Sequence, residues 1–205
     1  MYKLPYFTEQ NDEVVFDFMR KNSFAILTGY DGKFPVATHV PLDVKREGEK
    51  IICTGHMMKN TDHHRAFSQN ENVLAIFTGP HCYVSASWYV TKNVASTWNY
   101  MDVHAKGTIK FADEEQTKRI IKNLTDTYEL PQSEASFDKL PKEYVDRLVN
   151  AIIGFTIEIS GVENVFKLSQ NHIPETKERI ISNLVTRPDE ASHAIAAEMK
   201  KRIVS

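Results

Sequence analysis

The sequence is poor in cysteine, contains no long apolar run, and carries no excess of charge of either sign. Its 25 lysine and arginine residues stand against 27 aspartate and glutamate residues, so the net charge is −2. Such a balance provides no electrostatic attraction to nucleic acid or to an anionic membrane surface. No apolar stretch approaches the roughly 20 residues that cross a bilayer. The polar segment from Met1 to Glu13 also lacks the apolar centre of a signal peptide. We therefore expect a cytoplasmic protein with no membrane partner.

Several catalytic motifs are absent as well. The sequence has no Gly-x-Gly-x-x-Gly or P-loop pattern, and no Gly-x-Ser-x-Gly segment surrounds Ser85 or Ser87. The two cysteines, Cys53 and Cys82, lie in apolar stretches, and we favour two buried thiols over a disulfide. Five histidines lie between residues 56 and 104, none in the His-Glu-x-x-His spacing of zinc sites: His56, His63, His64, His81 and His104. We expect no metal site and no catalytic side chain.

An unusual stretch from Gly79 to Gly107 is the most informative part of the chain. It holds both tryptophans, Trp88 and Trp98, together with other rings and many hydroxyl and amide groups. An ordinary strand pair alternates apolar and polar residues to face a core and water. This stretch instead places large flat rings beside small hydrogen-bonding groups. A site for a flat ligand with polar edges needs that mixture.

The chain is rich in strands first and in helices afterwards. Alternating or continuous apolar patterns predict strands over residues 23–28, 34–44, 50–54, 72–78, 103–111 and 153–159. Helical patterns occupy residues 113–129 and 143–151, and two more helices begin at Pro174 and Pro188. This order favours an antiparallel barrel or sandwich with attached helices over an array of βαβ units.

Three segments could contact a ligand, although each also has a purely structural interpretation. The loop at 56–64 offers lysine, hydroxyl and amide groups before a helix, which suits a phosphate, but taken by itself the loop is more typical of a solvated connection. The segment 167–171 could present polar groups or simply turn the chain. The segment 38–42 could be an edge strand that carries a proline.

The two helices at the end of the chain could be taken for a DNA-binding helix-turn-helix. We do not favour that interpretation. The second helix opens with Asp189 and Glu190, whose charge has the wrong sign to face phosphates. The basic residues 200–202 at its end complement the helix dipole.

Taken together and in order, a set of short motifs resembles the PaiB-type FMN-binding split-barrel family, described as FMN-binding negative transcriptional regulators. The motifs cover nearly the whole chain and lie at 37–42, 55–57, 79–81, 83–85, 87–89, 97–100, 103–105 and 167–171. The sequence departs from the family pattern at Ala86 and Ser96, where proline is expected, and at Lys106. It also departs at 58–62, where Lys59 replaces an arginine and so loses the bidentate guanidinium fork.

The resemblance implies an α+β fold that is mainly antiparallel β. The expected fold is a six-stranded split β-barrel with peripheral and C-terminal helices. It further implies that residues 1–172 form the FMN-binding split-barrel domain with inserted helices. Residues 173–205 would then be a C-terminal helical extension packed on the same domain. Proteins of this kind are usually homodimers with the flavin in a groove between subunits.

The resemblance also implies which residues contact the FMN. The phosphate is expected near 56–61 and the isoalloxazine against 38–42 and 97–100, while Lys167 and Gln170 could come from the partner chain. The expected cofactor-binding residues are Thr38, His39, His56, Lys59, Asn60, Thr97, Trp98, Asn99, Lys167 and Gln170.

The leading hypothesis is therefore an FMN-binding protein that acts as a flavin-dependent oxidoreductase or flavin reductase. Since the cofactor would carry the electrons, the absence of a recognisable acid–base pair is consistent with this. One alternative is a negative transcriptional regulator, which the charge does not support. A second is a haem-binding split-barrel protein, in which His56 or His104 would contact the haem.

Overall fold

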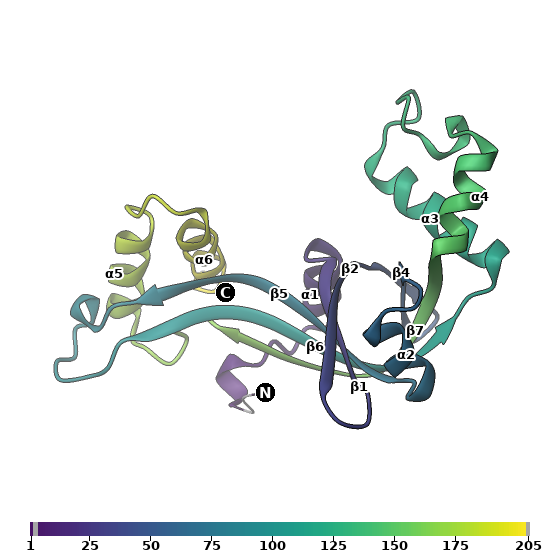
Figure 1. Ribbon diagram of the computed structural model, residues 1–205. Helices are drawn as coiled ribbons and strands as arrows, with labels where there is room; N and C mark the ends of the chain where they lie inside the picture. The colour runs from purple at the N-terminus through teal and green to yellow at the C-terminus, as the bar shows by residue number, and fades with distance from the viewer. Residues whose placement is uncertain (2–3, 204–205) are drawn as a thin grey trace. The chain divides into compact units, whose positions relative to one another are not determined.

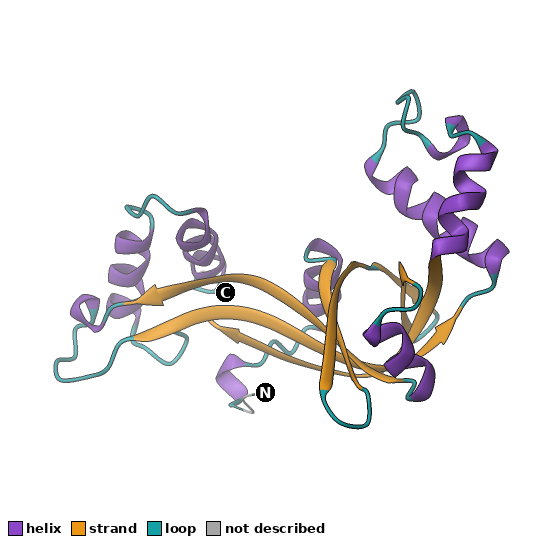
Figure 2. Cartoon of the chain, viewed as in Figure 1, coloured by secondary structure: helices purple, strands orange, loops and turns teal. Residues whose placement is uncertain are grey.

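The structure, a computed structural model, describes Met1 and residues 4–203. The strands are β1 Phe24–Tyr30, β2 Pro35–Pro41, β3 Asp43–Glu47, β4 Lys50–Met58, β5 Asn72–Val84, β6 Thr97–Phe111 and β7 Ile152–Lys167. The α-helices are α1 Asp12–Lys21, α2 Asp62–Gln69, α3 Glu114–Tyr128, α4 Lys142–Ala151, α5 Pro174–Leu184 and α6 Glu190–Lys201. Short 3₁₀ turns are η1 Pro5–Phe7, η2 Ala86–Trp88 and η3 Phe137–Lys139. The strands form one mostly antiparallel sheet in the order β2-β1-β5-β6-β7-β4-β3 (Figures 1 and 2).

The chain divides into two compact units. The first comprises residues 1–18, 78–103 and 163–205, and the second comprises residues 19–77 and 104–162. The long strands β5, β6 and β7 contribute segments to both units. A domain boundary at residue 172 remains a prediction. Among the described residues, no helix has both the length and the apolar character that crossing a membrane would require.

The fold class predicted from the sequence is confirmed, but the sheet has seven strands rather than six. The stretch at 34–44, predicted as one strand, is two strands that meet at Leu42. Residues before Leu42 pair with β1, and residues after it pair with β4. Pro41 ends the first ladder because it has no N–H group to donate.

Leu42 also joins the two ends of the sheet. In the sheet order β2 and β3 are the opposite edge strands, yet they are consecutive in the chain. Leu42 is 2% exposed, and its N–H donates to the Ser23 carbonyl at 2.8 Å. On β4, a Cβ at Gly55 would lie 3.1 Å from the Leu42 side chain, so the absence of a side chain there lets this corner pack tightly. The corner thus connects the two edge strands of the sheet.

The core of the second unit follows the predicted period of two. The alternation over 153–159 is confirmed as part of β7, where Phe155 and Ile157 are fully buried. Leu27 on β1 and Phe67 on α2 are also within 2% of full burial. Thr117 on α3 contributes a hydrogen bond to this core. Its hydroxyl accepts from the Gly154 N–H of β7 at 3.0 Å and fixes the helix against the strand.

The helices of the first unit pair through one apolar face. The helix predicted to start at Pro174 does so, and Ile180 and Leu184 of α5 are fully buried. Ile195 of α6 is fully buried as well, and α5 and α6 lie beside each other in Figure 1. The second helix starts two residues later than predicted, because Asp189 is its N-cap and accepts from the Ser192 N–H at 2.8 Å. The acidic opening of α6 is therefore a capping device.

Gly107 on β6 is a position where the packing tolerates no side chain. A Cβ there would lie 2.5 Å from the Glu158 carbonyl oxygen and 2.7 Å from Ile157 Cγ2. We expect Gly107→Ala to lower the free energy of unfolding by about 1–3 kcal/mol, because the backbone of β7 must shift. Urea denaturation of both proteins measures this difference.

Gly161 provides the matched control, because it lies on the same sheet and a Cβ there meets nothing within 4 Å. Gly161→Ala should leave stability unchanged or raise it slightly, since it reduces the freedom of the unfolded chain. Equal losses in the two variants would contradict the close approach of β6 and β7 at Gly107.

Candidate functional site

The predicted phosphate loop is a compact connection between β4 and α2 in the second unit. Asn60 adopts a positive φ of 64°, which turns the chain after Met58. The Thr61 hydroxyl accepts from the His64 N–H at 3.2 Å and donates to the Met58 carbonyl at 3.1 Å. Thr61 is thus the N-cap of α2, and the loop presents the N-terminal end of that helix.

Lys59, which the resemblance places at the phosphate, contacts another helix end. Its ammonium lies 3.4 Å from the Val149 carbonyl and 3.3 Å from the Asn150 carbonyl, both in the last turn of α4. Its backbone N–H donates to the Ala151 carbonyl at 3.0 Å. A cation at a helix C-terminus stabilises that end through the carbonyls left unpaired there. Phosphate contact by Lys59 requires the ammonium to turn away from these carbonyls, and it remains a prediction.

Arg65 is a cation of this loop that the sequence reasoning missed. Its Nη1 donates to the Asn60 carbonyl at 2.7 Å, and the Asn60 N–H donates to His64 Nδ1 at 3.2 Å. The signal in the sequence was its position one helical turn after the Thr61 cap. Asp62 adds a negative charge to the same loop. The hydrogen bond from the His63 N–H to its carboxylate holds the pKa of this carboxyl below the usual range.

His56 on β4 is the predicted residue with the most unusual surroundings in the second unit. Its Nδ1 is buried and has no hydrogen-bond partner within the described part of the chain. Burial lowers the pKa of the imidazole, so the ring is neutral at neutral pH. Thr38 and His39 lie on the edge strand β2, where the exposed His39 ring stacks on Phe24 with centroids 6.0 Å apart.

In the first unit the structure brings three predicted residues to one cavity of about 330 Å³. These are Thr97, Asn99 and Lys167. The remaining lining residues come from the N-terminal turn, the connection between β5 and β6, and the segment after β7: Leu4, Tyr6, Phe7, Tyr89, Val94, Ala95, Ser169, Asn171 and His172. The sequence reasoning missed Tyr89 and His172, although both lie within or beside the quoted motifs.

A buried amide–hydroxyl pair forms one wall of this cavity. Asn99 is fully buried, and its Nδ2 donates to Ser169 Oγ at 3.0 Å, while the Ser169 hydroxyl lies 3.1 Å from Asn99 Oδ1. Ser169 adopts a φ of 62°, which bends the chain just after β7. Asn99 therefore holds this turn in place, and its ligand role stays a prediction.

The segment 167–171 both turns the chain and contributes to the cavity. Gln170 stabilises the turn, because its Oε1 accepts from the Leu168 N–H at 2.7 Å and its Nε2 donates to the Phe166 carbonyl. Lys167 instead reaches the cavity and donates to Thr97 Oγ1 at 2.5 Å. Trp98 does not line the cavity; it is 53% exposed, and its ring meets the Tyr83 ring edge-on at 6.0 Å.

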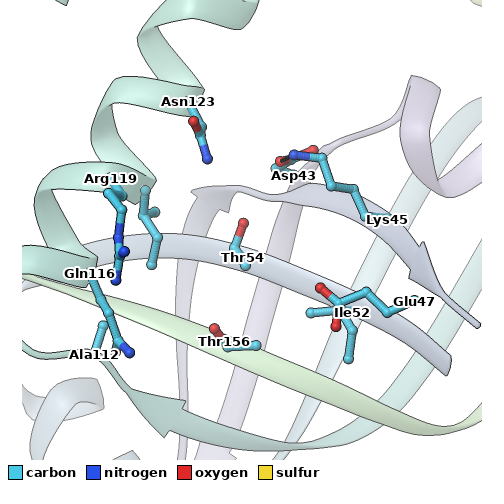
Figure 3. Close-up of a pocket in the computed structure, with 11 residues that line it drawn as sticks. Asp43, Lys45, Glu47, Ile52, Thr54, Ala112, Gln116, Arg119, Asn123 and Thr156 are labelled. Carbon is cyan, nitrogen blue, oxygen red and sulfur yellow. Dashed lines mark ion pairs between the residues drawn. The ribbon is translucent and has the colours of Figure 1, made fainter.

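A second hollow, of about 360 Å³, lies in the second unit between α3 and the strands β3, β4 and β7. Figure 3 shows Arg119, Gln116 and Asn123 of α3 on one side and the Asp43–Lys45 ion pair, 2.6 Å, on the other. Its lining contains none of the residues predicted from the sequence. Most of these polar side chains are exposed, so the hollow is an open groove.

The thiols offer no nucleophile to either unit. Cys53 and Cys82 are free and buried, as predicted. Burial raises the pKa of Cys53 to about 12 and that of Cys82 to about 11, so both remain protonated thiols at neutral pH. Among the described residues, no group of three or more His, Cys, Asp or Glu side chains could hold a metal ion.

Comparison with known proteins identifies the family. Residues 1–161 match the family model described as "Putative FMN-binding domain". Over 205 residues the chain is 31% identical to "Protease synthase and sporulation protein PAI 2" of Bacillus subtilis (strain 168), covering 99% of this chain and 98% of that protein. The chain belongs to this FMN-binding family, so the predicted family and the cofactor that defines it are confirmed.

Solved structures of low sequence identity share the fold. A flavocytochrome from Azotobacter vinelandii aligns with a TM-score of 0.62 at 14% identity, over 81% of this chain and 72% of that one. A FAD and heme binding protein from Mycobacterium smegmatis aligns with a TM-score of 0.58 at 15% identity, over 78% of this chain and 73% of that one. These similarities support the split-barrel fold class.

The buried imidazole of His56 should make stability depend on pH. In the unfolded chain a histidine takes up a proton near pH 6.5, whereas burial holds the pKa of His56 lower in the folded state. The unfolded state therefore binds the proton first, and the free energy of unfolding falls as the pH falls below about 6.5. We expect His56→Gln to lose less stability than the wild type between pH 7.5 and 5.5, measured by urea denaturation.

His64 and His172 are expected to contribute equally to the pH dependence of stability in the wild type and in His56→Gln. Burial lowers the pKa of both, and both are present in the two proteins compared. A pH dependence identical in wild type and His56→Gln would show that His56 is not held neutral by its surroundings.

Proposed function

We propose that the protein binds FMN and acts as a flavin-dependent oxidoreductase or flavin reductase. The observation that carries the proposal is the family match over residues 1–161, within which nearly all the quoted motifs lie. When bound, the flavin itself carries the electrons, so the protein has to supply binding, orientation and electrostatics rather than a catalytic side chain. The neutral state of both thiols is consistent with that division of labour.

The residues present suit such a ligand. His56 Nδ1 is a buried polar atom without a partner among the described residues, and a polar ligand is one way to satisfy such an atom. Near it in sequence, the N-terminal end of α2 and the cations Lys59 and Arg65 favour a phosphate. Asn60 of the same loop, Thr38 and His39 on β2, and Thr97, Trp98, Asn99, Lys167 and Gln170 in the first unit remain predicted flavin contacts.

A homodimer is part of this proposal. The β1–β2 hairpin forms one edge of the sheet and exposes three large rings: Phe24 at 68%, Phe34 at 60% and Tyr30 at 48%. Aromatic residues are enriched in the cores of protein interfaces. A second copy of the chain covering this hairpin would bury them, and Thr38 and His39 of the proposed site lie on the same hairpin.

The flavin phosphate can be tested by comparing FMN with riboflavin, which lacks it. In fluorescence titrations we expect the wild type to prefer FMN. Lys59→Met should weaken FMN binding about tenfold while leaving riboflavin binding unchanged, because a charge-assisted hydrogen bond contributes roughly 1.4 kcal/mol. Lys92→Met, which removes an exposed lysine of the β5–β6 connection, is the control. If riboflavin and FMN binding weaken equally, Lys59 is not a phosphate contact; if neither flavin binds the wild type, the proposed function is wrong.

The proposed dimer can be tested at the hairpin. We expect Phe24→Lys combined with Phe34→Lys to give a monomer, because charge replaces apolar rings at the interface, and to lower FMN affinity at least tenfold. Sedimentation velocity measures the mass, and flavin fluorescence measures binding in the same samples. Leu130→Lys, at a side chain that is 65% exposed elsewhere in the second unit, is the control and should remain dimeric. A wild type that sediments as a monomer with FMN bound would contradict this arrangement.

The alternatives drawn from the sequence, a negative transcriptional regulator and a haem-binding protein, remain predictions. The net charge of −2 argues against direct DNA binding, and the acidic start of α6 is occupied as an N-cap. The cytoplasmic location likewise remains a prediction.

A further inference from the structure

The cavity of about 330 Å³ in the first unit is lined by polar groups that could bind a ligand. Tyr89 is 2% exposed, yet its hydroxyl has no hydrogen-bond partner among the described residues. A buried phenol normally finds a partner, because leaving the hydroxyl unpaired costs the free energy of its desolvation. Tyr89 lines the cavity together with Asn99 and Ser169, whose side chains hydrogen-bond to each other. The Tyr89 hydroxyl is thus a buried donor that the described residues leave without an acceptor.

Lys167 supplies the charge of this site. Its ammonium donates to Thr97 Oγ1 and lies 5.8 Å from the centre of the Phe7 ring, but no carboxylate within the described part of the chain forms an ion pair with it. Partial burial of a cation without a counter-ion is unfavourable, and it lowers the pKa of this ammonium. The lining contains no aspartate or glutamate. An anion that enters the cavity is therefore attracted by Lys167 and is not repelled by a carboxylate of the lining.

The remaining walls are flat and aromatic. The Tyr6 and Phe7 rings meet edge-on with centroids 4.5 Å apart, and the Tyr89 and His172 rings also lie 4.5 Å apart. Burial lowers the pKa of His172, which leaves Lys167 as the one cation among the lining residues. A single positive charge matches a monoanion better than a phosphate monoester, which carries about −1.5 to −2 at neutral pH.

We propose that this cavity binds a small aromatic carboxylate, with Lys167 holding the carboxylate, Tyr89 donating a second hydrogen bond and the rings of Tyr6, Phe7 and His172 packing on the flat body. The cavity volume, about 330 Å³, lies at the lower end of the range for ligand pockets, roughly 300–1,000 Å³, which suits a one-ring ligand better than a whole flavin nucleotide. This inference deepens the proposed function, because Thr97, Asn99 and Lys167 are also proposed flavin contacts. A role for the carboxylate as a substrate of the flavin rests on that proposed function.

Benzoate is the probe, and benzamide is its neutral counterpart of the same shape. Calorimetric titrations use the full chain without flavin and the chain saturated with FMN. We expect benzoate to bind both forms and benzamide to bind at least about tenfold more weakly, because only the carboxylate pairs with the ammonium. Equal binding of the two probes, or no binding of benzoate, would overturn the proposal.

Three variants test the assignment of roles. Lys167→Met should abolish the preference for benzoate over benzamide, whereas Lys167→Arg should retain it. Tyr89→Phe, which keeps the ring and removes only the hydroxyl, should weaken benzoate about fivefold, the effect of one hydrogen bond. Lys92→Met is the matched control and should bind benzoate as the wild type does. Circular dichroism checks that each variant is folded, and an unchanged preference in folded Lys167→Met would overturn the proposal.

FMN binding, followed separately by flavin fluorescence, distinguishes this inference from the proposed function. If FMN binds and benzoate does not, only the carboxylate site is wrong. If benzoate binds and FMN does not, the carboxylate site stands and the proposed function falls. If FMN and benzoate displace each other completely, the cavity belongs to the flavin site and the separate carboxylate site is refuted.

Discussion

Close backbone approach along the long strands is the constraint on which the second unit depends. At Gly107 the Glu158 carbonyl of β7 occupies the space where a side chain would begin, 2.5 Å from an ideal Cβ. At Gly154 of β7 the α3 helix also approaches closely, since Thr117 lies 3.1 Å from the ideal Cβ and its hydroxyl accepts from the Gly154 N–H. At Gly107 the two strands therefore lie at a distance that only glycine permits, and at Gly154 a side chain would require α3 to shift by a few tenths of an ångström. The position of β4, and with it that of His56, follows from β7, with which β4 pairs.

The first unit is organised around polar groups that the protein satisfies only in part. Asn99 and Ser169 satisfy each other and fix the turn after β7, and Gln170 satisfies the backbone of that turn. Lys167 and Tyr89 line the cavity beside this turn, and the Tyr89 hydroxyl has no hydrogen-bond partner among the described residues. Structural roles and proposed ligand-binding roles are thus divided between neighbouring residues, which is why a motif as short as 167–171 supported two interpretations.

Much of the fold followed from local patterns in the sequence. The alternation around Phe155, the helical pattern over 113–129 and the proline at the start of α5 each act over a few residues, so their consequences were predictable. The seventh strand was not predictable in this way, because residues on both sides of Leu42 have the same strand pattern. Only their partners, β1 on one side and β4 on the other, separate them. The site shows the same limit: Thr97, Asn99 and Lys167 were identified by motif, but Tyr89 was not.

The sequence by itself determined the family, the strand-rich class and the residue types available to hold a flavin, because motifs and periodicities are properties of the order of residues. The tertiary structure decided which of those residues meet. It directed Lys59 toward the carbonyls of α4 and placed Gln170 within a turn. It also gathered Lys167, Thr97 and Tyr89 around one cavity. Contacts such as that between Lys59 and Asn150 join residues 91 positions apart in the chain, and they depend on the pairing of whole strands and helices.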